Sequence, residues 1–197
     1  MIVIGVTGGI GTGKSEVSKI LEELGAVVID ADKVGHSIYL PDTPGWQEII
    51  EAFGEDLIGE DRQIDRSKLG PIVFGNPEAL ATLNSITHPK IRQRLIELTE
   101  EKRGEGSKAV AIEAAILIEA GWVDLVDEVW VTAAQLETAV ERVSKRNNMP
   151  AEQVRARIES QMPQDERLKH ATVVVTNDGD LGSLREQLNK LWTERIQ

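Results

Sequence analysis

The chain of 197 residues contains no cysteine. It can therefore form no disulfide framework, no thiolate metal site and no cysteine nucleophile, which fits a reducing compartment. Long apolar runs are also missing, since no stretch approaches the ~20 residues of a membrane span. The first residues lack the basic region and the apolar stretch of a signal peptide. We therefore expect a cytoplasmic protein with no membrane partner.

Basic residues are scarce relative to acidic ones. The sequence has 22 Lys and Arg against 33 Asp and Glu, which gives a net charge of −11 at pH 7. Nucleic acid phosphates repel such a chain as a whole, so we expect no nucleic-acid partner, and any anionic ligand needs a local site. Apolar residues make up 41% of the sequence, which suffices for a buried core. At this length we expect one domain, or one core with a small inserted lobe.

Short apolar runs rich in β-branched residues alternate with helical periodicity. The runs predict strands at 2–6, 26–30, 109–117, 128–132 and 172–176. The last three are each expected to lead into a helix. After the first, apolar residues recur at helical spacing from Val17 to Leu24 and stop at Gly25, which suits a helix end. Strand, helix and strand within the first thirty residues form a βαβ unit, which implies a parallel sheet.

The stretch between the second and third of these strands is helical in period almost throughout. An apolar stripe begins at Trp46, and Asn76 followed by Pro77 is typical of a helix N-cap with proline at the first helical position. Because the stretch is too long for a simple connection, we expect a helical lobe at 33–104 inserted into the core. A second helical segment, a lid, is expected at 136–169. The core then comprises 1–32, 105–135 and 170–197.

A phosphate-binding loop stands between the first strand and the first helix. Residues 8–15, Gly-Gly-Ile-Gly-Thr-Gly-Lys-Ser, satisfy the pattern G, four residues, G, K and then S or T. Glycines let backbone amides turn toward a phosphate, the Lys14 ammonium adds a cation, and the Ser15 hydroxyl can bind Mg²⁺. The loop and the strand pattern together predict a P-loop NTPase fold, a three-layer α/β/α sandwich with a parallel five-stranded sheet.

Other nucleotide-binding classes fit this loop less well. A dinucleotide-binding turn would need a third glycine at the position of Lys14. A switch GTPase would carry a guanine-binding motif that is absent, and the DxxG at 32–35 follows Lys14 too closely. A small-molecule kinase fits best, and a regulator that binds ATP without turning over a small molecule stays open as the rival.

Two sets of charged residues are candidates for kinase chemistry. Asp30 and Asp32 follow the second strand, and on an extended backbone their spacing of two would make them face the same side, where one orients an acceptor hydroxyl. The segment 142–169 carries seven basic and four acidic residues. Within it, Arg142 and Arg146 share a helical face and can both reach one polyphosphate.

Taken together, these segments resemble the dephospho-coenzyme A kinase family over nearly the whole chain. The resemblance rests on 7–15 (TGGIGTGKS), 28–32 (VIDAD), 87–91 (THPKI), 161–163 (QMP) and 175–179 (VTNDG). These are similar to the family's TGGIGSGKS, (V)IDAD, HPxI, QMP and (I)xNxG elements. Many folds share the loop alone, but the DAD and HP elements at these distances are much more specific.

The resemblance implies ATP-dependent phosphorylation of the ribose 3′-hydroxyl of dephospho-CoA, the last step of coenzyme A synthesis. It implies that Asp32 is the acceptor-orienting base and that Lys14 and Arg142 stabilise the charge of the γ-phosphoryl group. The expected metal ligand is Ser15, for Mg²⁺. The expected ATP-binding residues are Gly9, Gly11, Thr12, Gly13, Lys14, Ser15, Glu16, Arg146, Asn177 and Gly179. The expected substrate-binding residues are Thr7, Asp32, His36, His88 and Ile116.

Several positions depart from the family's pattern or suit a second interpretation. Glu16 puts a carboxylate in the first helical turn after the loop, where Thr is usual. Ala115 begins an AILIE segment where PLLFE is typical, and Glu113 stands where a Walker-B-like Asp is common, with its role toward Mg²⁺ left open. His88, before Pro89, would on its own mark a helix start. The four Trp lie in apolar patterns typical of a core, and we expect a monomer or a weak homo-oligomer.

Overall fold

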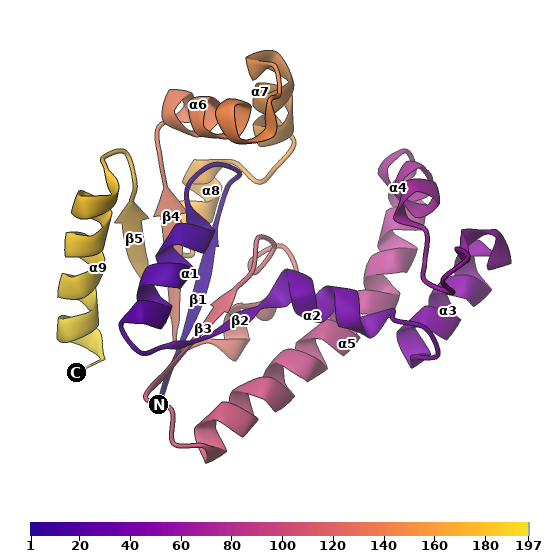
Figure 1. Ribbon diagram of the computed structural model, residues 1–197, viewed down its shortest axis with the longest axis horizontal. Helices are drawn as coiled ribbons and strands as arrows, with labels where there is room; N and C mark the ends of the chain where they lie inside the picture. Colours follow the sequence, from indigo (N-terminus) through magenta and orange to yellow (C-terminus); the bar gives the residue numbers. More distant parts are fainter. Residues whose placement is uncertain (197) are drawn as a thin grey trace. The chain divides into compact units, whose positions relative to one another are not determined.

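The computed structural model describes residues 1–196 and contains one parallel sheet within them. Its strands run in the order β2-β3-β1-β4-β5 (Figure 1). The strands are β1 (Ile2–Gly8), β2 (Val27–Asp30), β3 (Ala109–Glu113), β4 (Glu128–Ala133) and β5 (Val173–Thr176). The prediction of an α/β fold with a parallel five-stranded sheet is confirmed.

The helices are distributed over two compact units. One, the sheet unit, comprises residues 1–30 and the chain from Thr99 onward; the other, the helical unit, comprises residues 31–98. The sheet unit contains α1 (Lys14–Glu23), η2 (Trp122–Leu125), α6 (Leu136–Asn147), α7 (Ala151–Glu159), α8 (Gln164–Leu168) and α9 (Leu181–Arg195). The helical unit contains α2 (Ala31–Ile38), α3 (Pro44–Phe53), η1 (Glu55–Leu57), α4 (Arg66–Phe74) and most of α5 (Pro77–Gly104). No helix among residues 1–196 is long and apolar enough to cross a membrane.

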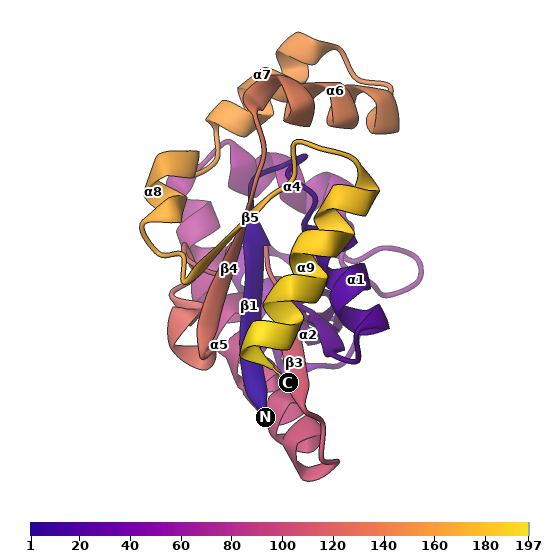
Figure 2. The ribbon, with the colours of Figure 1, turned by 90° about the vertical axis from the view of Figure 1, so that its left-hand side faces the viewer.

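Side chains on both faces of the central strands β3, β1 and β4 are buried, whereas the edge strand β5 alternates buried and exposed residues. On one face, α1 and α9 lie side by side over the strands (Figure 2), and Leu188 and Trp192 of α9 join Trp130 of β4 in the same core cluster. On β1, a Cβ at Gly5 would lie 2.6 Å from a methyl group of Leu117, so the absence of a side chain lets the chain after β3 pack directly on the sheet. Burial on both faces explains why the sequences of the central strands are continuous apolar runs.

The third strand is shorter than the apolar run that predicts it. The run at 109–117 predicts a strand over its whole length, but β3 ends at Glu113. After Ala114 donates to the Val6 carbonyl at 3.0 Å, the chain turns, and Ala120 and Trp122 donate to carbonyls four and five residues back. Periodicity misses this end because Ala114, Leu117 and Ile118, beyond the end of the strand, are buried apolar residues as well. The prediction that a helix follows this strand is also wrong, since only the four-residue 3₁₀ helix η2 is found there.

The helical unit has a core and capped helices of its own. Its apolar cluster is built around Ile49, Leu57 and Leu69. The Asn76 carboxamide oxygen accepts from the amides of the second and third residues of α5, at 2.9 and 3.3 Å, which confirms the cap predicted there. His88 lies inside α5, which continues through Pro89, so the interpretation of His88 as a helix start is wrong.

Candidate functional site

The loop between β1 and α1 is shaped by glycines at positions where a side chain does not fit. Gly11 and Gly13 have φ angles of +81° and +97°. A Cβ at Gly11 would lie 2.7 Å from the Ala139 carbonyl oxygen, and one at Gly13 would collide with the Asn177 carboxamide. Both close approaches and the positive φ angles exclude other residues. The loop thus contacts the lid through Ala139 and the β5–α9 connection through Asn177.

Lys14 is the first residue of α1, and its side chain folds back over the loop. The ammonium group donates to the Gly8 carbonyl oxygen at 2.8 Å and to that of Gly9 at 3.3 Å. The N-terminal turn of α1 directs its backbone amides toward the same region, where they favour an anion. The loop therefore combines a cation with helix amides, as a bound polyphosphate requires.

Oxygen donors meet at the carboxyl ends of β2 and β3. The Ser15 hydroxyl donates to a carboxylate oxygen of Glu113 at 2.7 Å, and Asp30 is the neighbour of Glu113 in the strand register. Mg²⁺ in nucleotide sites takes one or two protein oxygens and completes its shell with phosphates and water. The Ser15 and Glu113 pair fits such an ion. The described residues 1–196 contain no cluster of three or more His, Asp or Glu arranged as a metal site.

Glu113→Gln is expected to raise the Mg²⁺ concentration needed for half-maximal activity by about tenfold or more, because a carboxylate that can bind the ion is lost. Gln keeps the size of the side chain and can still accept from the Ser15 hydroxyl. Titration of activity with Mg²⁺ at saturating ATP measures the change. A matched control is Glu186→Gln, an exposed carboxylate on α9. An unchanged Mg²⁺ requirement in Glu113→Gln would remove Glu113 from the metal site.

Arg142 on α6 connects the lid to the β5–α9 connection. Its guanidinium donates to the carbonyl oxygens of Asn177 at 2.6 Å and Gly179 at 3.2 Å. The Asn177 side chain is buried and donates to the Thr12 carbonyl oxygen at 2.9 Å. Arg142, the connection and the phosphate loop therefore form one hydrogen-bonded chain. In this arrangement the Arg142 guanidinium is engaged with carbonyl oxygens.

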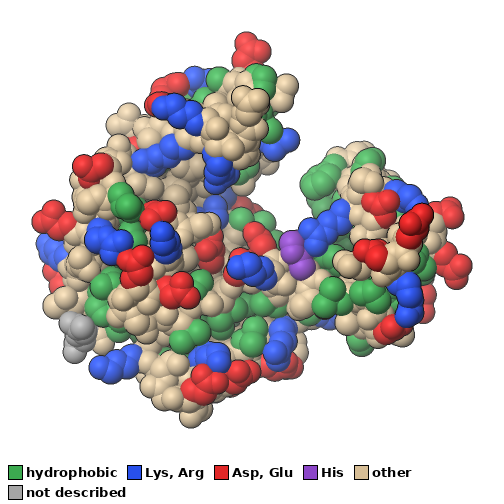
Figure 3. All heavy atoms as spheres, viewed as in Figure 1, with side chains coloured by type: hydrophobic (Ala, Val, Ile, Leu, Met, Phe, Trp, Pro, Cys, Tyr) green, Lys and Arg blue, Asp and Glu red, His purple; other side chains and the backbone are tan. Residues whose placement is uncertain are grey.

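Arg146, the second arginine predicted for the lid, is exposed one turn further along α6. Its Nε donates to the side chain of Asn147 at 3.1 Å. Lys and Arg side chains gather over α6 and α7 in Figure 3. Two of these cations, Lys145 and Arg155, pair with carboxylates of α6, Glu141 and Glu137.

A cavity of about 400 Å³ lies between the phosphate loop and the lid. Its size lies in the range of small-ligand pockets. Gln161, between α7 and α8, closes one side, and its side-chain oxygen accepts from the Ile10 amide at 2.8 Å. The lining residues include Gly9, Ile10, Thr12, Thr132, Leu136, Ala139, Gln161, Met162, Pro163 and Arg167.

Arg167 on α8 is the buried cation of this region, with 1% of its surface exposed. Its guanidinium pairs with Glu119 at 3.0 Å and donates to the Ala115 carbonyl oxygen at 3.1 Å and to the Thr7 hydroxyl at 3.4 Å. These bonds tie the lid to the end of β1 and to the turn after β3. Ile116, in that turn, is 38% exposed.

The remaining predicted site residues belong to the helical unit. Asp32 lies in the first turn of α2 and His36 in its last turn. The expectation that Asp30 and Asp32 face one side of an extended backbone is wrong, because Asp30 ends β2 and the next residue already begins a helix. His88 is half-buried in α5, and burial lowers the pKa of its imidazole below the usual value.

Comparisons with known proteins place the chain in a family. The model of the dephospho-CoA kinase family matches residues 2–183. The chain belongs to the dephospho-CoA kinase family. It is 45% identical over 197 residues to the dephospho-CoA kinase of Dehalococcoides mccartyi. The matched region covers 100% of this chain and 99% of that protein. The resemblance found in the sequence is confirmed, and membership implies ATP as the phosphoryl donor.

Solved structures agree with this family. The dephospho-CoA kinase from Campylobacter jejuni is 31% identical with a TM-score of 0.74, over 98% of this chain and 96% of that one. The protein TT1252 from Thermus thermophilus, known from a crystal structure, is 33% identical in sequence to this chain. Its structure matches with a TM-score of 0.82, over 100% of this chain and 98% of that one. The P-loop kinase fold of the chain is therefore shown by proteins of clear sequence similarity.

Three residues around the loop of this kinase were missed by sequence reasoning. Gln161 and Arg167 contact the loop region from more than 150 residues away, and the Thr132 hydroxyl lies 2.6 Å from that of Thr12. The QMP element marked the neighbourhood of Gln161. Arg167 was one of seven basic residues of its segment, and no local pattern separates it from the exposed ones.

Proposed function

We propose that this kinase transfers the γ-phosphoryl group of ATP to the ribose 3′-hydroxyl of dephospho-CoA, giving CoA and ADP. The observation that carries the proposal is the loop built around Gly11, Gly13 and Lys14 in a chain that matches the family from end to end. In such a transfer the acceptor oxygen bonds to phosphorus as the bond to the β–γ bridging oxygen breaks. The protein contributes by positioning the reactants and by stabilising charge.

The loop and the lid provide the groups for ATP. Backbone amides from Gly9 to Ser15 bind the phosphates, and the Lys14 ammonium exchanges its loop carbonyls for phosphate oxygens. Asn177 and Gly179 border the nucleotide, and Arg146 adds charge from the lid. Arg142 donates to the β5–α9 connection through Nη1 and Nη2, and its remaining N–H donors are proposed to stabilise the charge of the γ-phosphoryl group.

Ser15 and Glu113 would hold Mg²⁺. Bound there, the ion would neutralise charge on the ATP phosphates. The pair lies at the ends of α1 and β3, next to the loop, and its two oxygens are already 2.7 Å apart. The first turn of α1 also carries Glu16, whose carboxylate is favourable to the helix dipole.

Asp32 is proposed as the group that accepts the proton of the 3′-hydroxyl. It stands two residues beyond the end of β2, in the first turn of α2. His36, on the same helix, and His88 of α5 are proposed to contact dephospho-CoA, as are Thr7 and Ile116 of the sheet unit. A carboxylate is a suitable base for a hydroxyl that loses its proton only as the phosphoryl group is transferred.

The purified protein with MgATP is expected to release ADP when dephospho-CoA is added. Shikimate, gluconate and nucleoside monophosphates are the comparison acceptors, and ADP release is followed with a coupled assay. Turnover of one of those acceptors instead would overturn the proposed substrate. Binding of ATP without ADP release from any acceptor would favour a regulator over an enzyme.

A further inference from the structure

In the helical unit, Arg66 and Tyr39, which have no role in the function proposed above, form a cluster with His36. The Arg66 guanidinium lies over the ring of Tyr39, with Cζ 5.6 Å from the ring centroid. The His36 ring meets the Tyr39 ring edge-on, with centroids 6.2 Å apart and an angle of 70° between planes. Tyr39 is partly buried because it packs against the apolar cluster of this unit. The core therefore fixes the ring that the Arg66 guanidinium and the His36 imidazole contact.

Within residues 1–196, no carboxylate pairs with Arg66, although acidic side chains outnumber basic ones in the chain. Its neighbour Asp65 caps α4 and accepts from the Ser67 amide at 2.9 Å and from the Ser67 hydroxyl at 2.6 Å. Arg62, in the preceding loop, pairs with Asp42 at 2.6 Å. The nearby carboxylates are thus used elsewhere, and the N–H groups of Arg66 remain available to an external anion.

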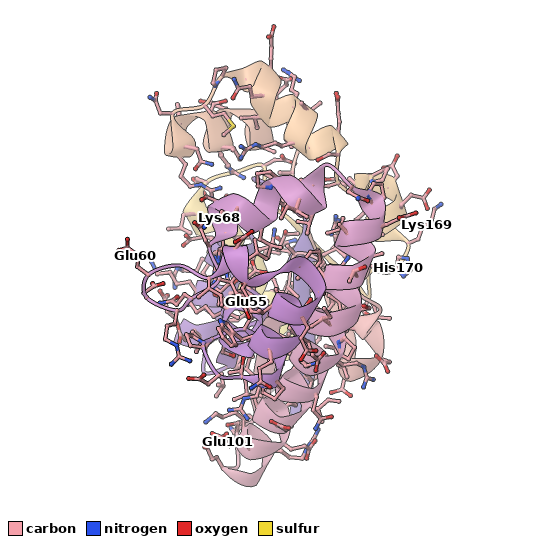
Figure 4. All side chains as sticks on the ribbon, turned by 90° about the vertical axis from the view of Figure 1, so that its right-hand side faces the viewer. Glu55, Glu60, Lys68, Glu101, Lys169 and His170 are labelled. Atoms are coloured by element: carbon pink, nitrogen blue, oxygen red, sulfur yellow. The ribbon has the colours of Figure 1, made fainter. Side chains whose placement is uncertain are left out.

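Lys68, which is labelled in Figure 4, is the other cation of α4. Its ammonium donates to the Asp56 carbonyl oxygen at 2.7 Å, which fixes it to the protein's own backbone. Arg66 instead has an aromatic face as its neighbour. Stacking on an aromatic ring holds a guanidinium plane in place and leaves its donor edge open.

The cluster continues the face of α2 that carries Asp32. His36 follows Asp32 by four residues and lies on the same face of α2, and Tyr39 comes directly after the last residue of the helix. Burial raises the pKa of the Tyr39 phenol; Arg66 opposes this shift and the Asp32 carboxylate adds to it. The phenol therefore stays neutral and keeps its O–H as a hydrogen-bond donor.

We propose that Arg66, Tyr39 and His36 bind the diphosphate of the acceptor dephospho-CoA, an inference that rests on the proposed function. At neutral pH the diphosphate is the only ionised group of dephospho-CoA, since its adenine, ribose, pantetheine and thiol parts are neutral. A guanidinium presents paired N–H donors that match phosphate oxygens, and the phenol and imidazole add further donors. The cluster thereby distinguishes an acceptor with a diphosphate from a nucleoside without one.

The test is Arg66→Gln, measured by equilibrium binding with the nucleotide site filled by a non-hydrolysable ATP analogue. Loss of a charged hydrogen-bond donor is expected to weaken dephospho-CoA binding by roughly 10- to 100-fold. Binding of adenosine, which lacks the diphosphate, is expected to stay within about twofold. Arg62→Gln is the matched control, because Arg62 is an exposed arginine of the same unit with a carboxylate partner.

Steady-state kinetics provide the second measurement. In Arg66→Gln the KM for dephospho-CoA is expected to rise by a similar factor, with the KM for ATP unchanged. Tyr39→Leu, which removes the stacking face, is expected to share the defect, and Tyr39→Phe, which keeps it, is expected to lose less. Equal weakening of adenosine and dephospho-CoA, or an affinity equal to that of Arg62→Gln, would overturn the inference. Binding of dephospho-CoA by the unsubstituted protein without its phosphorylation would refute the proposed function. A selective loss of that binding in Arg66→Gln would then still support the binding site.

Discussion

Replacing Lys14 by alanine is expected to lower kcat/KM for ATP by about 10²- to 10³-fold, the loss typical of one preorganised donor at developing charge. The ammonium lies against the Gly8 and Gly9 carbonyl oxygens, at the rim of the loop that would receive the phosphates. Both ATP affinity and kcat are expected to fall, because the same cation faces the nucleotide in the ground state and the transition state. Nucleotide binding and steady-state kinetics measure the two effects separately.

Lys19→Ala is the matched control for this substitution, since Lys19 is exposed on the same helix. Its activity is expected to equal that of the unmodified protein. Thermal unfolding of both variants shows whether the loop survives the loss of the Lys14 bonds to its carbonyls. A folded Lys14→Ala protein with the activity of Lys19→Ala would refute the assignment of the phosphate loop.

Much of this site follows from local sequence because its parts are continuous in the chain. The loop glycines, Lys14 and Ser15 lie between a β-branched run and an amphipathic helix, and the backbone alone brings them together. The cap at Asn76 is predictable for the same reason, because its partners are two and three residues away. Because the contacting residues are close together in the sequence, these features can be predicted without a structure.

Contacts between distant segments were not predictable. Glu113 meets Ser15 across 98 residues, and Arg167 meets Thr7 across 160. Only the sheet order, with β3 beside β1 and β4 on its other side, brings these side chains together. Glu113 has the Ser15 hydroxyl as its partner, a contact that no spacing in the sequence encodes.

Arg167 and Arg66 show that the number of charged residues in a segment does not predict which arginine is buried and which is exposed. Both belong to stretches rich in charged residues, yet Arg167 is buried with Glu119 as its partner and Arg66 is exposed on an aromatic ring. A buried guanidinium without its carboxylate is strongly unfavourable, so Arg167 is held by the fold. Arg66 has no such requirement, and its availability is what makes it a ligand group.

Asp32→Asn is expected to lower kcat by about 10²- to 10⁴-fold, the range found when a general base is lost. Asparagine has nearly the same shape but cannot take the proton of the 3′-hydroxyl. The KM for ATP is expected to change little, because the assigned contacts of Asp32 are with the acceptor. Rates at saturating ATP and dephospho-CoA, compared with direct ATP binding, separate the two effects.

Asp30→Asn is the decisive companion variant, since Asp30 ends β2 beside Glu113 and Asp32 begins a helix. Because one is on a strand and the other on a helix, their side chains are not equivalent, and only one is expected to act on the acceptor. If Asp32 is the base, Asp30→Asn keeps most of its kcat and instead changes the Mg²⁺ requirement through its neighbour Glu113. A full kcat in Asp32→Asn, together with its collapse in Asp30→Asn, would transfer the role of base to Asp30.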